Sequence, residues 1–495
     1  MGQGDPATQE RPAKAGLLAG PTAKMIFNLG LLSGGQVMTK AISFVAFAYL
    51  THALGAAQYG AVEYAMGLST FAALAIDGGL GAVGVRRISQ GEDTPERLAA
   101  LVPTAQLCVA GIVAPGMLLF AWLFANDARA VQLTALVALS VMLLPWKQDW
   151  LFQSVGKMAH IVMAQVIRTA AFAIGVIAIV HKGADLNRVG MMEIASVAAA
   201  TLFLLVRQQQ TIAPFRTSFN ATDLIGLARE GIPIGAAAIV WALIQYAPLM
   251  MLANMMGMAE TGYFGAAHRL GVSLVTFSWI YHFNLYPTLA SRMGGDPKAM
   301  AGFTRASFRA CAWGGIAVGL GLTLLAKPLL GLIYPAQFEA AAKAFQVLVW
   351  TFPITLLSGH ARWILVAARR PNDTLIAQCI GGVTALIGGP VLIHFYGGVG
   401  AAASMVLSCA TVWAAAHFFV LKHGGPSPFL PCVWPAIAAG GVIAALHFVN
   451  LNPWLATVVG LAAFGLLALT DRALLRDLMA LIKPAAPSKP EAVNP

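Results

Sequence analysis

Long apolar stretches follow one another along nearly the whole chain, and short segments holding charged residues, Gly or Pro separate them. A helix needs about 20 apolar residues to cross a bilayer. The pattern therefore predicts an all-α integral membrane protein with about 14 transmembrane helices. The expected spans cover residues 25–50, 59–85, 98–125, 130–152, 158–180, 189–206, 231–255, 262–287, 308–333, 343–367, 374–395, 398–421, 430–449 and 453–470.

Composition agrees with this pattern. Of 495 residues, 58% are hydrophobic and 10% are charged, whereas soluble domains contain roughly 25% charged residues. The spans leave no room for a large soluble domain. The net charge of +11 is spread mostly over short loops, where anionic lipid headgroups are nearer partners than nucleic acid.

The loop charges predict an orientation. If Met1 is cytoplasmic, the inside segments hold 22 Lys and Arg residues and the outside loops hold 5. Cytoplasmic loops of membrane proteins have an excess of Lys and Arg. Both termini are therefore expected in the cytoplasm, which requires an even number of spans.

A short motif occurs twice. Residues 54–60 contain Gly55, Ala57 and Gly60, and Gly257, Ala259 and Gly262 follow 202 residues later. Six predicted spans separate the copies, so both motifs run the same way through the membrane. The chain should therefore form two six-helix lobes in a parallel repeat, plus two C-terminal helices.

The expected organisation follows from these spans. We expect a disordered cytoplasmic N-terminus (1–23), an N-lobe (24–206), an amphipathic cytoplasmic linker (207–229), a C-lobe (230–421), two further spans (422–470) and a cytoplasmic tail (471–495).

Basic residues inside the predicted spans are candidates for substrate binding, because a charge within the bilayer is costly and usually functional. A solvated cationic cavity could neutralise an anionic headgroup through guanidinium and ammonium donors. Internal pairing is the alternative, for example between Lys40 and Glu63 at similar depth. The candidates are Lys40, Arg168, Arg269 and Arg362, with His268 added because it adjoins Arg269.

Two acids lie in the second predicted span. Glu63 and Asp77 could bind a coupling proton or cation. Alternatively, Glu63 pairs with Lys40, and Asp77 hydrogen-bonds a neighbouring helix beside Gly78 and Gly79. For Glu63 we favour pairing.

No cofactor or metal site is indicated. Gly79 to Gly84 matches GxGxxG, but it closes a span instead of following a strand, so close helix packing is the expected use. The five cysteines show no CxxC spacing, and the histidines show no HExxH. No P-loop is present, so ATP is not expected to drive the protein directly.

Several stretches together resemble one family of transporters. They are Leu54-Gly55 with Tyr59-Gly60, Asp77-Gly78-Gly79-Leu80, Arg86-Arg87-Ile88, Asp149-Trp150-Leu151-Phe152-Gln153, Gly156-Lys157-Met158, Gly231-Ile232-Pro233, Gly262-Tyr263-Phe264, Ala266-Ala267-His268-Arg269-Leu270 and Tyr334-Pro335. In order and spacing the chain resembles the polysaccharide transporter family, the Wzx-type lipid-linked oligosaccharide flippases of the multidrug/oligosaccharidyl-lipid/polysaccharide exporter superfamily.

This resemblance implies translocation of a polyprenyl-diphosphate-linked oligosaccharide from the cytoplasmic to the periplasmic leaflet of a bacterial inner membrane. It implies two lobes that rock about a central cationic cavity, with Lys40 and Arg269 facing the headgroup. Membrane lipids would be partners, and glycan polymerases or glycosyltransferases could be. The resemblance would imply a basic residue in the second span, whereas this chain has the acids Glu63 and Asp77 there.

Two other functions stay open. A cation-coupled drug exporter of the same superfamily would have a smaller and less cationic cavity. An integral-membrane polymerase or glycosyltransferase would need a large outside loop or an acidic metal cluster, and the predicted outside loops are short.

Overall fold

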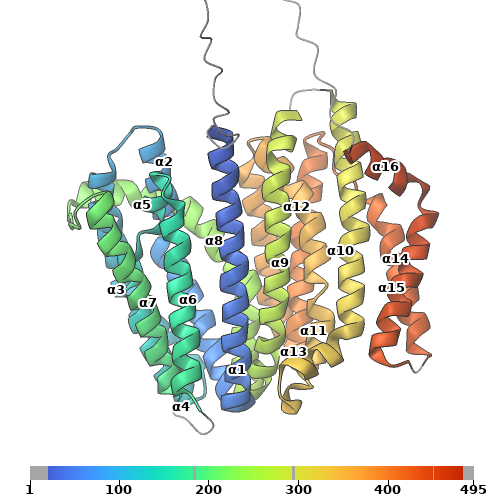
Figure 1. Cartoon of the computed structure of the whole chain (residues 1–495), viewed down its shortest axis with the longest axis horizontal. Coiled ribbons are helices and arrows are strands. Elements are labelled where there is room, and N and C mark those ends of the chain that lie inside the picture. The colour runs from blue at the N-terminus through green and yellow to red at the C-terminus, as the bar shows by residue number, and fades with distance from the viewer. Residues whose placement is uncertain (1–20, 182–185, 293–295, 450, 483–495) are drawn as a thin grey trace, which may run out of the picture.

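A computed structural model describes residues 21–181, 186–292, 296–449 and 451–482, and within them it contains helices and no strand. The helices run side by side in one bundle (Figure 1). The disorder predicted for residues 1–20 and 484–495 lies outside the described residues. Residues 21–23, also predicted to be disordered, begin the first helix.

The longer helices follow the predicted spans. They are α1 (Pro21–Asp77), α3 (Pro95–Phe124), α4 (Ala128–Val141), α6 (Met158–Ile179), α7 (Asn187–Thr211), α8 (Ala221–Met256), α9 (Met258–Arg292), α10 (Pro297–Ile333), α12 (Thr351–Ala367), α13 (Pro371–Lys422), α14 (Val433–His447) and α15 (Pro453–Thr470). Shorter helices are α2 (Leu80–Ser89), α5 (Asp149–Ser154), α11 (Ala341–Leu348) and α16 (Arg472–Ile482), with single turns η1 (Leu144–Lys147), η2 (Ala336–Phe338) and η3 (Leu430–Cys432).

The structure is that of a multi-pass membrane protein. In the described part of the chain, 11 helices are long and apolar enough to cross a membrane. Two of these, α1 and α13, are each divided by a glycine with positive φ, Gly55 and Gly397. At 1.5 Å per residue the 57 residues of α1 would extend about 85 Å, far more than the roughly 30 Å of a bilayer core. The break at Gly55 separates the two predicted spans, and the exact count of 14 stays a prediction.

The repeated motif has the same backbone geometry in both copies. Gly55 has φ 74° and ψ 175°, and Gly257 has φ 87° and ψ 176°. Such positive φ values favour glycine, which has no Cβ to clash with the backbone. Each glycine begins the turn into the second helix of its half, as the predicted repeat requires.

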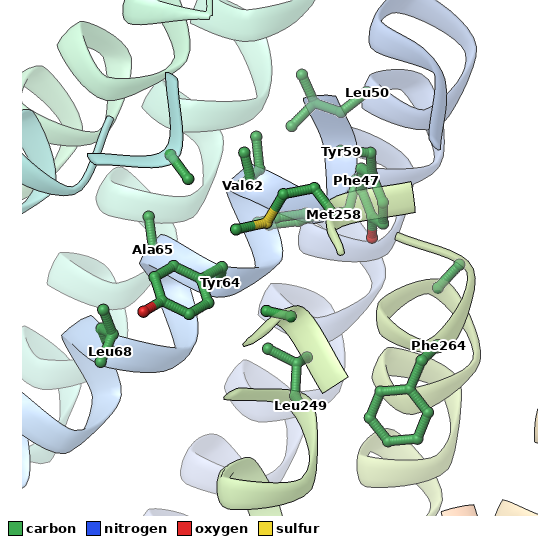
Figure 2. Close-up of a cluster of buried hydrophobic side chains, with 14 of the residues drawn as sticks. Phe47, Leu50, Tyr59, Val62, Tyr64, Ala65, Leu68, Leu249, Met258 and Phe264 are labelled. Carbon is green, nitrogen blue, oxygen red and sulfur yellow. The ribbon is translucent and has the colours of Figure 1, made fainter. Parts of the chain in front are cut away.

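We refer to α1–α7 as the N-lobe and to α8–α13 as the C-lobe. The start of α1 and helix α16 lie at the same end of the bundle (Figure 1), which we call the inner end. Gly55 follows the start of α1 by 34 residues, or about 51 Å of helix, so we call its end of the bundle the outer end. Gly257 lies there too, because Gly60 packs against Met258. Between the lobes, side chains on both halves of α1 pack with Leu249, Met258 and Phe264 from α8 and α9 (Figure 2).

The separate amphipathic helix expected in residues 207–229 is not formed. Helix α7 continues to Thr211, residues 213–220 are irregular, and Ala221 already begins α8. Asn220 caps α8 by accepting a hydrogen bond from the backbone N–H of Thr222 at 3.1 Å. Asn is a favoured residue at a helix start, so this local signal divides the segment between two long helices.

The two C-terminal spans pack against α10. Trp313, Ile316 and Leu320 of α10 contact the apolar faces of α14 and α15. Arg309 of α10 pairs with Asp471 at 2.6 Å and with Asp477 at 2.9 Å, which holds α16 at the inner end. Helix α16 was not predicted from the sequence, which assigned residues 471–495 to a tail.

Candidate functional site

A buried ion pair joins the two lobes. Arg269 of α9 donates from Nε and Nη2 to Oε1 of Glu63 on α1, at 2.9 Å and 2.7 Å. Tyr59 donates its hydroxyl to the same carboxylate at 2.6 Å. The Glu63 side chain is 6% exposed and that of Arg269 is 22% exposed. The pair therefore lies at the lobe interface and is largely shielded from surrounding water and lipid.

Neighbouring residues shape this pair. The Arg269 guanidinium lies 3.2 Å from the centre of the Phe47 ring, a cation–π contact from the first half of α1. Gly265, one turn before Arg269, leaves room for the acid, since a Cβ there would lie 2.5 Å from Cγ of Glu63. The site is thus built from both halves of α1 and from α9.

The suggested pairing of Lys40 with Glu63 is wrong, because Arg269 and Tyr59 bind the carboxylate. Glu63 lies 8 residues beyond the Gly55 turn and Lys40 lies 15 residues before it, so their depths differ by about 10 Å. Lys40 is exposed. Lys40, Arg269 and Glu63 together therefore hold one uncompensated positive charge.

His268 points away from this site. It is 3% exposed, its Nε2 donates to the carbonyl of Gln245 at 2.9 Å, and its ring stacks on Phe264. Successive residues of a helix face different directions. Adjacency to Arg269 in sequence therefore did not bring His268 to the ion pair.

Arg168 is paired within the N-lobe. It donates to Oε1 of Glu193 at 2.5 Å, across α6 and α7, and Glu193 is 5% exposed. The sequence analysis missed Glu193, although an acid near the start of a span that neighbours a span with an arginine was the available signal. This geometry matches the internal-pairing alternative for Arg168.

Asp77 has backbone partners. Its carboxylate accepts from the N–H groups of Gly79 at 3.2 Å and Gly81 at 3.3 Å, at the start of α2, and from Nε2 of Gln106 on α3 at 3.3 Å. The hydrogen bond to a neighbouring helix that the sequence suggested is therefore formed. In the GxGxxG stretch, Gly84 packs on the Trp150 ring, where a Cβ would lie 2.7 Å from ring carbons, so the packing role is confirmed.

Glycines bring the lobes together at both ends. At the outer end, a Cβ on Gly60 would lie 1.8 Å from the carbonyl oxygen of Met258, and one on Gly262 would lie 2.0 Å from that of Ala56. At the inner end, a Cβ on Gly79 would lie 2.5 Å from the carbonyl oxygen of Gly231. The lobes are therefore in contact on the outer side and on the inner side of the Arg269–Glu63 pair.

Ion pairs add to the contact at the inner end. Arg86 and Arg87 of α2 both pair with Glu230 of α8, and Arg97 of α3 pairs with Asp223 of α8 at 2.9 Å. Three N-lobe arginines thus bind two acids at the start of the C-lobe. Of these two acids, Asp223 lies in the predicted linker (207–229) and Glu230 is the first residue of the predicted C-lobe.

Solved structures show the same fold. One, titled "Lipid II flippase MurJ, inward closed conformation", matches with a TM-score of 0.72 and 11% identity, over 91% of this chain and 99% of that chain. A second, an inward-facing multidrug resistance MATE family transporter of the MOP superfamily, matches with a TM-score of 0.66 and 12% identity, over 78% and 94%. At these identities the likeness concerns the fold.

Among curated proteins no significant sequence match was found. A family model described as "Polysaccharide biosynthesis protein" matches residues 26–293, more than half of the chain, including α1 with Glu63 and α9 with Arg269. The chain therefore belongs to the polysaccharide biosynthesis protein family and has the multi-span fold shared by the MurJ flippase and MATE transporters.

Proposed function

We propose that the protein is a flippase that moves a polyprenyl-diphosphate-linked oligosaccharide from the cytoplasmic to the periplasmic leaflet of a bacterial inner membrane. The observation that supports this most directly is the uncompensated positive charge of this region: Glu63 pairs with Arg269, whereas Lys40, on the same helix α1, is exposed and is not paired with that acid. Family membership and the fold shared with a lipid II flippase agree with a lipid-linked substrate.

The headgroup would compete for the interface cations. A diphosphate presents several oxyanions, which match the donors of Arg269 and Lys40. Binding between the lobes would take Arg269 from Glu63, while Tyr59 continues to donate to that carboxylate. Loss of the inter-lobe ion pair would then weaken the contact between α1 and α9 and let the lobes separate on one side.

The glycan would remain outside this cationic site. Glycosyltransferases would supply the substrate at the cytoplasmic face, and a polymerase would consume it on the other side. Arg168 is assigned a structural role through its pairing with Glu193. Neither Glu63 nor Asp77 needs to titrate for the headgroup exchange itself.

A cation-coupled exporter is the second candidate, and one observation favours it. Glu63 is a buried acid between the lobes of a fold shared with a MATE transporter, and an acid in that position could bind a proton or cation in exchange for Arg269. This function predicts transport of small amphiphiles and no dependence on a diphosphate.

The test compares both substrates in one preparation. The purified full-length chain in vesicles is given a fluorescent polyprenyl-diphosphate disaccharide or a cationic dye, and leaflet exchange or uptake is measured. We expect lipid exchange that falls at least about tenfold in Lys40→Gln and Arg269→Gln, as the loss of a charged hydrogen bond implies. Arg129→Gln, at a largely exposed outer position, is the matched control. Dye uptake without lipid exchange would favour the exporter.

A further inference from the structure

One cavity in the C-lobe is lined by buried polar atoms that have no hydrogen-bond partner among the described residues. It has a volume of about 170 Å³ and lies between α9, α12 and α13. The unpartnered atoms are Nε of Arg362, Nε2 of His282, Oγ1 of Thr374 and Oε1 of Gln378. Buried polar groups in folded proteins are normally paired. Four unpartnered polar atoms around one cavity therefore indicate that a polar ligand or water occupies it.

Arg362 gives the cavity its charge. The other arginines deep in the spans, Arg168 and Arg269, each contact a carboxylate, whereas no described acid lies within 4.0 Å of Arg362. A buried guanidinium without a counterion is costly inside a membrane protein. The simplest counterion is an oxyanion, because guanidinium donors match its geometry.

The neighbouring groups narrow the class of oxyanion. Nδ1 of His282 donates to the carbonyl of Ser278 at 2.7 Å, and His282 is 1% exposed. In the neutral ring Nε2 is then an acceptor. The ligand must accept from Arg362 and donate to His282. A phosphate that keeps one P–OH group does both, whereas sulfate and carboxylate have no proton to donate at neutral pH.

The cavity lies at the depth of lipid headgroups. Arg362 is 5 residues before the end of α12 and Thr374 is 3 residues after the start of α13, which places them about 8 Å and 5 Å from the inner helix ends. Two tryptophans, Trp279 and Trp363, also line the cavity. Trp279 is 46% exposed, and indoles favour the membrane–water interface. One wall of the cavity therefore reaches the protein surface.

We propose that this cavity binds a phosphoryl group that carries one P–OH, in which Arg362 and Thr374 donate to the phosphoryl oxygens and the P–OH donates to Nε2 of His282. The phosphoryl group belongs to a phosphomonoester lipid headgroup or to free phosphate. This site lies within the C-lobe, apart from the Arg269–Glu63 pair, and would stand even if the flippase function failed.

Binding is tested on the full-length protein in detergent. Free anions, inorganic phosphate and sulfate, are followed by the shift in melting temperature. Lipids, phosphatidic acid and phosphatidylcholine, are followed as bound adducts by native mass spectrometry. Arg362→Gln removes the charge, and Arg370→Gln, at an exposed position at the same helix ends, is the matched control.

We expect phosphate, phosphatidic acid or both to bind the unmodified protein at least about tenfold more tightly than Arg362→Gln, since a charge-assisted hydrogen bond is lost. Arg370→Gln should match the unmodified protein. A response to phosphatidic acid alone identifies a lipid as the source, and a response to phosphate alone identifies the free anion.

Three results would overturn the proposal. Equal binding by Arg362→Gln and the unmodified protein would mean that the cavity holds water only. Sulfate binding as tight as that of phosphate would refute the hydrogen bond donated to His282. If Arg362→Gln does not fold, Thr374→Val takes its place, and unchanged phosphate and phosphatidic acid binding by that variant would be equally decisive.

Discussion

At the scale of single residues, the central feature is one acid that pairs with one of two cations on the helices of this region. Glu63 accepts two hydrogen bonds from Arg269 and one from Tyr59, while Lys40 stays exposed nearby. A buried carboxylate takes the partner whose donors fit it most closely. Arg269 is therefore held by the acid, and Lys40 is left available to a ligand.

Replacing Glu63 should be harmful in a way that a second replacement repairs. Glu63→Gln leaves the Arg269 guanidinium buried and unpaired beside Lys40, and we expect a loss of about 3–5 kcal/mol in the free energy of unfolding. Arg269→Gln added to Glu63→Gln should recover part of that loss, with a coupling of about 1–3 kcal/mol. Denaturant unfolding in detergent measures all three variants.

The control replaces the other cation. Lys40→Gln combined with Glu63→Gln should show clearly smaller coupling, because these two residues are not bonded. Equal coupling in the two cycles would refute the pairing seen here. Stability is the readout for this pair, because Arg269→Gln alone is already expected to lower lipid exchange.

Accessibility should differ between the two cations. In a background without the five native cysteines, we expect Lys40→Cys to react quickly with a small hydrophilic thiol reagent, and Arg269→Cys to react slowly until substrate is added. The reason is that position 40 is exposed, whereas the Arg269 side chain is 22% exposed and held between the lobes.

Exposure to lipid must be separated from exposure to water. Ile112→Cys serves this purpose, since Ile112 is 76% exposed on α3, in the middle of an apolar span. A hydrophilic reagent should leave it unmodified. A Lys40→Cys variant that reacts as slowly as Ile112→Cys would place Lys40 in lipid and remove it from the proposed site.

At the scale of helices, glycines decide how closely the lobes approach. The contact of α1 with α9 at the outer end and the contact of the α1–α2 junction with α8 at the inner end are both backbone against backbone. Small residues permit such approach in membrane proteins. Each contact can therefore act as a closure that forms or breaks as a unit.

An alanine at Gly60 should open the outer end. Its Cβ would lie 1.8 Å from the carbonyl oxygen of Met258. Because that oxygen belongs to the backbone, rotation of a side chain cannot relieve the clash. We expect a Val62→Cys reporter, at a position that is buried in the lobe interface, to be labelled faster from the outer side in Gly60→Ala. Gly235→Ala, which meets Gly78 at the inner end, should not increase that labelling.

Gly111→Ala is the matched control, because it lies in α3 with no atom within 4 Å of the added Cβ. Alanine is favoured over glycine in a helix by up to about 1 kcal/mol, so this variant should be as stable as the unmodified protein. If Gly60→Ala were labelled no faster than Gly111→Ala, the outer contact would not be a closure.

At the scale of the whole molecule, the arrangement is a helical bundle with both described ends on one side. The start of α1 and helix α16 lie at the inner end (Figure 1), and that is the end where Arg86, Arg87 and Arg97 gather. From the positive-inside pattern we predict that this end faces the cytoplasm.

Reporter fusions test this orientation. Fusions after Pro426 and after Leu481 should both give cytoplasmic signals, and a fusion after Asn126, between α3 and α4, should give a periplasmic one. A periplasmic signal at either of the first two positions would be incompatible with two lobes in parallel repeat and with substrate entry from the cytoplasm.

Sequence alone was sufficient for the features that depend on hydrophobic length and backbone conformation. A bilayer imposes one length on every span and requires helices to satisfy the backbone, so the all-α membrane class followed from the apolar pattern. The repeat could be recognised for a similar reason. Gly55 and Gly257 adopt a backbone conformation that favours glycine, so glycine occurs at the same position in both copies of the motif.

Tertiary structure decided which charged groups meet. Depth along a helix could be estimated from residue number, but the direction of a side chain and the identity of the facing helix could not. Glu63 therefore binds Arg269 instead of Lys40, Arg168 binds Glu193, and Arg362 has no acid beside it among the described residues. These outcomes depend on packing between helices that are distant in sequence. A shift of a few ångströms there decides whether two charged groups form an ion pair, because their interaction weakens with distance.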